Sequence, residues 1–487
     1  MNKSLTKLKL LKIKRTNEQF VYFVGLLYAL STGKTNPVEL IKNAQSYNSE
    51  LYSNTLKEIY RLGVGWGYGL SKSCEIMATK ITDNKEMEFK HLLMKFAQVV
   101  RLGQDLIPFV KSEFIATLHT YSSNYERNLD SQKLFLEMFY TLMSSGTIMV
   151  AANSLLSMVA DAQDAERMLI LSVFGITLGM GSFSFVLYML FPRDKLMIGS
   201  NDLSKKFTFS LYLSIMLSVL IGTILFYFNA LPIPLILAVS AGFLFIPGFI
   251  ARKLEEEIVA TNEWYPPFIR HLGQLISAVG SISKALDSAL KSDFGILTKH
   301  VNALRNRIQN RVRTEVAFDL FSQEACSDTI TNSNSILSLA MAKGGDISEI
   351  TSALSDIVSK INDLRKKRLH IAKTFEIVII LLHVITMAIF GLMNKILDVF
   401  HTVIGSLNVS TSVMNIHPID PAFFASIMPI IIVSTSVIGA FGIKSAEGGL
   451  YKTIWFNIAL LTVAGSIGYY LTTVFLGQYL GSSVLNL

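Results

Sequence analysis

The sequence lacks the residues from which disulfide frameworks, metal centres and nucleophilic sites are built. It has two cysteines, Cys74 and Cys326, in 487 residues, so both are expected to be free thiols. Its eight histidines include no pair at ligand spacing, and no Ser/His or Cys/His arrangement can be assembled from the sequence. These absences predict no catalytic residue, no metal and no cofactor, so we expect a protein that is not an enzyme.

A phosphate-binding loop is also missing. The segment 31–35, Ser-Thr-Gly-Lys-Thr, resembles the end of such a loop, but Tyr28 stands where the first glycine belongs. No buried strand runs into the segment, as the motif requires. We therefore expect no nucleotide site. Nucleic acid is not expected as a partner either, because few aromatic residues lie among the basic clusters.

Charge is scarce within seven apolar stretches. Apolar residues make up 51% of the chain and the mean hydropathy is +0.44, which is too high for an ordinary soluble chain. A helix of about 20 apolar residues crosses the hydrocarbon layer of a membrane. The predicted spans are 134–160, 167–191, 207–228, 231–250, 375–393, 421–443 and 454–476. The fourth span contains Pro232, Pro234 and Pro247, so we expect it to be kinked or interfacial.

The charge of +8 is distributed unevenly between the loops. Lysine and arginine gather before residue 134, in the 192–206 loop and before residue 373, whereas the 396–420 loop has neither. Since cytoplasmic loops collect these residues, we predict a multi-pass protein of the cell membrane. Its N-terminus and both large polar regions would be cytoplasmic. Asn408-Val409-Ser410 is a possible glycosylation site on the predicted outer loop.

Four regions follow from this alternation. We predict a helical domain at 1–133, four membrane helices at 134–250, a second helical domain at 251–372, and three membrane helices at 373–487 with an outer loop at 394–420. The apolar run at 20–30 is too short to span, and we interpret it as part of the first domain rather than as a signal peptide. No strand-like alternation of any length appears, so the fold class is all-α.

The two polar regions resemble each other. In the second, apolar residues recur at steps of three and four from Ile347 to Leu364, which predicts a helix with one apolar face. Gly-x-Asp precedes a long helical pattern in both regions, at Gly103 and at Gly344, and each pattern continues into a span. An earlier match pairs 20–27 with 268–275. We infer two related helical bundles, each joined to the membrane by its last helix.

Inside the spans few residues invite a functional role. Gly175 and Gly179 form a small-xxx-small motif that predicts close helix packing, either within one subunit or in a homodimer. His383 is interpreted as a neutral imidazole bonded to a helix carbonyl rather than as part of a pathway. Glu137 and Glu376 lie near the entries of their spans and are expected to pair with Lys133 and Lys373, as anchors or as coupling residues.

Basic clusters on the polar regions are the best candidates for a docking surface. A solvated face is the alternative interpretation, and the run Arg365-Lys366-Lys367-Arg368 is interpreted as a positive-inside anchor. An acidic cytoplasmic partner would be attracted by such clusters. The candidate docking residues are Lys85, Lys90, Lys95, Arg101, Arg305, Arg307, Arg311 and Arg313.

With these features the chain resembles the type II secretion F domains of type IV filament platform proteins, over roughly residues 17–393. The span count is similar to that of the archaeal branch. The glycine-led turns of that family are matched at Gly33, Gly69, Gly103, Gly280, Gly344 and Gly345. The resemblance implies a non-enzymatic membrane platform of an archaellum or archaeal pilus. Its implied partners are a cytoplasmic hexameric assembly ATPase, pilin-like filament subunits and the lipid membrane.

Two alternatives come from other classes. Two related halves also suggest a secondary transporter, but transporter repeats lie within the membrane and have broken or polar helices at its midplane. A membrane-bound signalling or lipid-modifying protein is the other alternative. It would require a catalytic constellation, and the sequence offers none.

Overall fold

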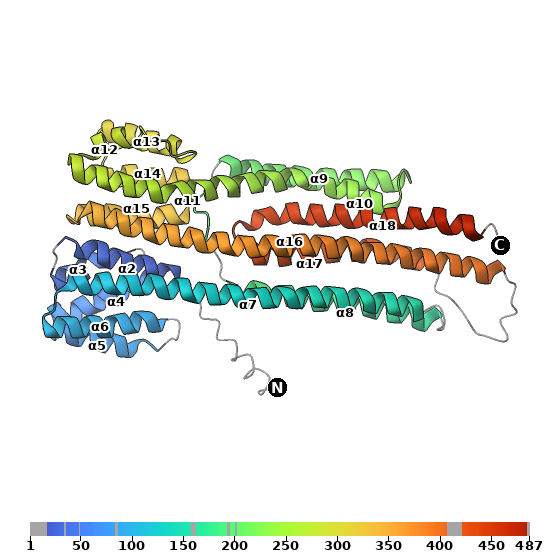
Figure 1. The fold of residues 1–487 in the computed structure, drawn as a ribbon, viewed down its shortest axis with the longest axis horizontal. Coiled ribbons are helices and arrows are strands. Elements are labelled where there is room, and N and C mark those ends of the chain that lie inside the picture. Colours follow the sequence, from blue (N-terminus) through green and yellow to red (C-terminus); the bar gives the residue numbers. More distant parts are fainter. Residues whose placement is uncertain are drawn as a thin grey trace. The chain divides into compact units, whose positions relative to one another are not determined.

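The computed structural model describes residues 17–33, 36–47, 49–82, 86–156, 162–191, 195–199, 202–406 and 421–484. These residues form helices joined by turns (Figure 1) and include no strand, apart from one isolated bridge between Met197 and Ser327. Within the described ranges, seven helical stretches are long and apolar enough to cross a membrane, and one of them combines α10 and α11 as defined below. The predicted fold class, an all-α polytopic membrane protein, is confirmed.

The described helices vary in length from one turn to 60 residues. In chain order they are α2 (Glu18–Ser31), α3 (Pro37–Ala44), α4 (Glu50–Tyr60), the π-helical turn η2 (Arg61–Gly65), α5 (Leu70–Lys80), α6 (Met87–Leu102), α7 (Leu106–Leu156), α8 (Ala162–Leu190), α9 (Asp202–Tyr227), α10 (Ile233–Gly242), α11 (Phe245–Val279), α12 (Ile282–Ala289), α13 (Leu297–Gln309), α14 (Thr314–Ala325), α15 (Asp328–Ala342), α16 (Ile347–Ser406), α17 (Pro421–Glu447), the 3₁₀ turn η4 (Tyr451–Thr453) and α18 (Ile454–Val484).

The chain divides into two compact units. Unit 1 comprises Met1–Asn128, Lys195–Asn201 and Glu256–Lys366, and unit 2 comprises Leu129–Asp194, Asp202–Glu255 and Lys367–Leu487. Helices α7, α11 and α16 each contribute residues to both units. Helices of both predicted F-type domains therefore pack in one compact unit, and the boundaries of those two domains remain a prediction.

Helix α2 lies in the core of unit 1. Asn17 caps its N-terminus by accepting a hydrogen bond from the amide of Phe20, 3.1 Å away, as polar side chains at this position commonly do. Every residue from Phe20 to Ser31 is buried. The ring of Phe23 stacks on that of Tyr52 in α4 at 4.5 Å between centroids. The apolar run at 20–30 is thus a core helix, surrounded on all sides by other helices.

Helix α11 contains Pro266 and Pro267 without ending at them. Proline has no amide hydrogen, so Pro266 leaves the carbonyl of Asn262 without its usual i+4 donor. The side-chain amide of Asn362 in α16 donates to that oxygen at 2.7 Å. The hydroxyl of Ser355, also in α16, donates to the carbonyl of Pro266 at 3.0 Å. The side chain of Asn362 therefore takes the place of the hydrogen bond that Pro266 removes from α11.

Four of the six predicted turn glycines have left-handed backbone angles, with φ between 64° and 78°, and these are Gly69, Gly103, Gly280 and Gly344. Gly33 and Gly345 do not, but both lie against backbone. A Cβ at Gly33 would be 3.3 Å from the oxygen of Lys343, and one at Gly345 would be 3.0 Å from the oxygen of Ala29. The turn between α15 and α16 therefore packs closely on the end of α2.

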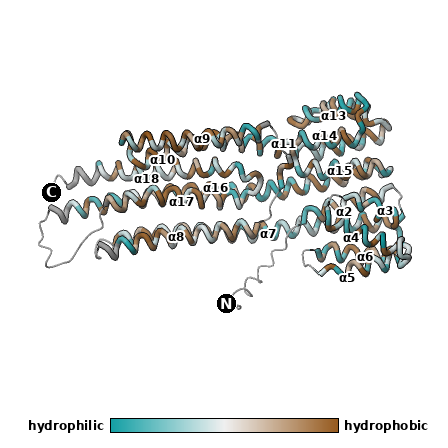
Figure 2. Tube along the Cα trace, turned by 180° about the vertical axis from the view of Figure 1, so that it is seen from behind, coloured by the Kyte–Doolittle hydropathy of each residue, from teal (hydrophilic) through white to brown (hydrophobic). Residues whose placement is uncertain are grey.

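Unit 2 is built from apolar helices, and hydrophobic residues predominate along α8, α9 and α17 in Figure 2. One cluster of buried side chains is centred on Met387, Phe390, Phe424 and Ile432, and a second on Phe139, Phe375, Ile379 and Ile443. The fourth predicted span is broken, because α10 ends at Gly242 and α11 begins at Phe245. Pro234 and Pro247 lie in the first turns of these two helices, where a missing amide hydrogen does little harm.

Candidate functional site in unit 2

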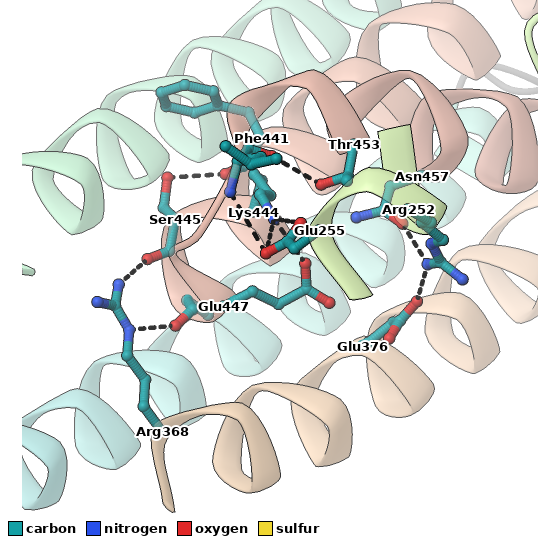
Figure 3. A network of polar contacts seen from close by, with 12 residues as sticks. Arg252, Glu255, Arg368, Glu376, Phe441, Lys444, Ser445, Glu447, Thr453 and Asn457 are labelled. Atoms are coloured by element: carbon teal, nitrogen blue, oxygen red, sulfur yellow. Dashed lines mark hydrogen bonds and ion pairs between the residues drawn. The ribbon is translucent and has the colours of Figure 1, made fainter. Parts of the chain in front are cut away.

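Six charged side chains of unit 2 form one network of polar contacts (Figure 3), which we call the charge network. Helix α11 supplies Arg252 and Glu255, α16 supplies Arg368 and Glu376, and α17 supplies Lys444 and Glu447. The network thus contains three positive and three negative side chains. Because charge is expensive to bury without a partner, this balance is what allows the network to lie inside a helix bundle.

Lys444 is the most deeply buried member, with 1% of its side chain exposed. Its ammonium lies 3.2 Å from a carboxylate oxygen of Glu255 and 3.5 Å from one of Glu447, a turn later in α17. Glu255 also accepts a hydrogen bond from the backbone amide of Leu450 at 3.3 Å. Lys444 therefore joins α11 to the end of α17.

Arg252 makes the second connection. Its guanidinium donates to Glu376 in α16 at 3.1 Å and to the side-chain oxygen of Asn457 in α18 at 3.0 Å. It also lies over the ring of Phe456, 3.4 Å from the centroid, where the face of the ring attracts a cation. Two ion-pair or amide contacts and one aromatic contact hold this side chain between three helices.

Arg368 caps the end of α17 although it belongs to α16. It is 2% exposed and donates to the carbonyls of Ala446 at 2.9 Å and Ser445 at 3.0 Å. Gln132 of α7 donates to the same Ala446 oxygen at 2.9 Å. The last carbonyls of a helix have no partners within it and carry partial negative charge, so a buried arginine both satisfies and neutralises this helix end.

The turn after α17 fits the network only because it is made of glycine. Gly448 and Gly449 have φ of 74° and 69°, a region that residues with a side chain rarely adopt. A Cβ at Gly448 would lie 2.8 Å from the guanidinium carbon of Arg368, and one at Gly449 would lie 1.8 Å from a carboxylate oxygen of Glu255. Two glycines therefore let the backbone reverse directly against two charged groups.

Together these contacts connect α7, α11, α16, α17 and α18 of unit 2. The arrangement is suited to holding helices together and not to turnover, since every charged group is engaged by a fixed partner. Among the described residues, no group of three or more His, Cys, Asp or Glu side chains is placed to hold a metal ion. The network therefore holds these five helices of unit 2 to one another.

The sequence contains the members of this network but not its pairing. Glu376 was expected to pair with Lys373, and that expectation is wrong, since Glu376 pairs with Arg252, 124 residues away. Lys133 lies near Asp130, at 3.8 Å, and Glu137 is exposed. The run 365–368 is not one exposed anchor, because Arg368 is buried. Spacing along one helix predicts only contacts between neighbours on that helix. Arg252 belongs to another helix, α11, so its contact with Glu376 cannot be predicted in this way.

The predicted docking residues lie in unit 1, and most of those described have a carboxylate partner. Lys90 instead donates to the carbonyl of Ile81, Arg311 has no side-chain partner among the described residues, and Lys85 lies outside them. The ion pairs are Lys95–Glu113, Arg101–Glu75, Arg305–Asp287, Arg307–Glu324 and Arg313–Glu315. Five of these cations are therefore paired with acidic side chains.

Three further predictions concern unit 2. A Cβ built at Gly175 or at Gly179 would meet nothing within 4 Å, so within the part of the chain that is described these glycines are not used for close packing. His383 is buried, with Nε2 3.2 Å from the hydroxyl of Ser436. Asn408, the possible glycosylation site, lies outside the described residues.

The fold and the network define a class: a polytopic all-α membrane protein in which long helices serve both a membrane bundle and a second helical unit. Residues 268–397, which include Arg368 and Glu376 of the charge network, match the family described as type II secretion system (T2SS), protein F. The predicted F-type resemblance is confirmed for residues 268–397.

More specific similarity extends over nearly the whole chain. It is 25% identical over 501 residues to "Flagella accessory protein J" of Methanocaldococcus jannaschii, covering 96% of this chain and 86% of that protein. It is 22% identical over 479 residues to the protein of the same name in Methanococcus voltae, covering 93% and 84%. No solved structure matches the chain. These similarities, to a secretion-system protein and to flagella accessory proteins, confirm the prediction that the chain is not an enzyme.

Proposed function

We propose that this chain is the membrane platform protein of an archaeal type IV filament machine, and of an archaellum in particular. The observation that carries the proposal is similarity to flagella accessory protein J over 96% of the chain, together with an F domain at 268–397. Seven apolar helices give it the membrane bundle that a platform needs.

In this role the chain carries movement and does not generate it. A cytoplasmic assembly ATPase would act on unit 1, and pilin-like filament subunits would be raised from the membrane beside unit 2. The charge network supports a role for unit 2 in transmitting movement, because it fixes five helices of that unit to one another. A bundle joined in this way moves as a body, which is how small displacements at one site reach another.

The orientation belongs to the same proposal. Lysine and arginine concentrate in unit 1 and its flanking loops, which favours the cytoplasmic side for that unit. We also propose that basic residues of unit 1 contact the ATPase, that Gly175 and Gly179 form a homodimer contact, and that Asn408 is glycosylated on an outer loop.

Deletion and complementation in the source organism test the function. We expect cells that lack the chain to retain filament subunits in the membrane and to assemble no filament, and we expect the wild-type gene to restore assembly. Native purification in mild detergent should recover the assembly ATPase or filament subunits with the chain. Normal filaments on the deletion strain would contradict the proposal. Solute transport by the purified chain in liposomes would favour the secondary transporter instead.

A further inference from the structure

An exposed aromatic loop stands out on unit 1. Residues 64–69, which we call the aromatic loop, begin within the π-helical turn η2 and are all exposed. Trp66 is 64% exposed, Tyr68 is 49% exposed and Val64 is 47% exposed. Large apolar side chains contribute to folding when they are buried, so these three contribute little to the stability of unit 1.

The loop is nevertheless held in one conformation. The backbone amides of Trp66, Tyr68 and Gly69 donate to the carbonyls of Arg61, Leu62 and Gly63, respectively, at 3.0–3.2 Å. At its base the hydroxyl of Ser73 donates to the carbonyl of Gly69 at 2.8 Å. Gly67 and Gly69 have φ of 74° and 78°, and these left-handed angles let the chain turn back so tightly. The aromatic side chains are therefore presented on a pre-formed support.

Cations surround the aromatic side chains. The guanidinium of Arg61 lies 5.7 Å from the ring centre of Trp66, and the ammonium of Lys72 lies 6.0 Å from that of Tyr68. Arg61 is paired with Glu58, but Lys57 and Lys72 are exposed and have no carboxylate partner among the described residues. The surface around the loop is thus apolar at its tip and positively charged at its rim.

Tryptophan, tyrosine and arginine dominate the energetics of protein interfaces, and uncharged tips with charged rims are their usual arrangement. A loop that is already ordered loses little conformational entropy on binding. A positive rim attracts an acidic surface and opposes a basic one. We propose that the aromatic loop docks into an apolar pocket with an acidic rim on the cytoplasmic assembly ATPase. This assignment rests on the proposed function and names a contact through which that function would operate.

Binding of the purified ATPase to the full-length chain in detergent micelles tests the assignment. We expect Trp66→Ala with Tyr68→Ala to weaken binding by at least about tenfold, as truncation of central interface aromatics does. Gly67→Ala keeps both aromatic side chains, and its Cβ would meet nothing within 4 Å. Because it strains only the backbone, we expect it to weaken binding by a smaller factor.

The charged rim has its own variant and control. Lys57→Glu with Lys72→Glu should weaken binding at low salt and leave a shallower dependence on ionic strength. Ile296→Ala, which truncates another exposed side chain of unit 1 (47% exposed), should bind as the wild type does. Helical circular dichroism and elution as a single species confirm that each variant is folded.

The outcomes separate the assignment from the function. If the wild type binds the ATPase and the Trp66/Tyr68 variant binds equally well, the loop is not the contact, while the platform function stands. If the wild type does not bind the ATPase at all, both fail. If the variant instead loses binding to vesicles of anionic lipid while its affinity for the ATPase is unchanged, the loop is a membrane contact and the assignment is wrong.

Discussion

The side-chain amide of Asn362 donates to the backbone carbonyl of Asn262, 2.7 Å away and 100 residues earlier in the chain. This contact satisfies the oxygen that Pro266 leaves without a donor. Asn362→Ala would leave a buried acceptor unsatisfied, which costs about 1–3 kcal/mol. We expect a lower midpoint for loss of helix on heating in detergent. Asn332→Ala removes a side chain whose hydrogen bond lies within α15 and should change the midpoint much less; equal losses would contradict the proposed role of Asn362.

The same contact shows what the sequence could predict. Periodic apolar residues define helices, and the seven spans follow from length and charge. The pairing of Asn362 with a helix containing two prolines does not follow, because partners so far apart in the chain are brought together only by the packing of whole helices. The charge network escaped prediction for this reason. The sequence predicts that Arg368 belongs to an exposed anchor, whereas this side chain is buried against the end of α17.

Truncation of Lys444 tests the charge network. Lys444→Met would leave Glu255 and Glu447 facing each other without a cation, and breaking a buried ion pair on one side costs about 3–5 kcal/mol. We expect a large loss of stability in detergent-solubilised protein and loss of filament assembly in cells. The double variant Lys444→Met, Glu255→Met removes one charge of each sign and should recover part of the stability. If it is as unstable as the single variant, the ion pair is not what Lys444 contributes.

Two glycine positions of unit 2 give a matched comparison. Gly449→Ala imposes a left-handed angle on alanine, at about 1–2 kcal/mol, and its Cβ would displace the carboxylate of Glu255. We expect it to destabilise the protein by more than the backbone term alone. Gly175→Ala places a Cβ where nothing lies within 4 Å and should leave thermal stability unchanged. Loss of a dimer in native mass spectrometry of Gly175→Ala would show that this face meets a second copy.

Reversing the charge of one side chain, Arg311, tests the basic docking residues without breaking an ion pair. Arg311 is exposed and has no side-chain partner among the residues described, unlike Arg307, whose reversal would also strand Glu324. If the basic side chains of α13 and of the turn after it meet an acidic partner, Arg311→Glu should slow association with the ATPase severalfold at low salt and change dissociation little. Surface plasmon resonance at two ionic strengths separates the two rates. Unchanged association would remove Arg311 from the docking surface.

His300 in α13 gives unit 1 a defined dependence on pH. Burial lowers the pKa of its imidazole below the usual value of 6.5, with the charge of Glu324 opposing that shift. In the unfolded chain the imidazole titrates near about 6.5, so below that pH the unfolded state binds a proton that the folded state does not. Stability should therefore fall as the pH is lowered from about 7 through 6.5 towards the pKa of the folded protein.

His300→Gln cannot bind that proton, so the wild type should lose stability relative to this variant over the same window. The measurement is the midpoint of thermal unfolding in detergent, taken at steps of about 0.5 from about pH 7.5 to about pH 5.5. This range brackets the pKa of the imidazole in the unfolded chain. His119→Gln, which replaces an exposed histidine of α7 in the same unit, controls for loss of a histidine as such and should follow the wild type. A difference between wild type and His300→Gln that stays constant with pH would show that the pKa of His300 is the same in the folded and the unfolded chain.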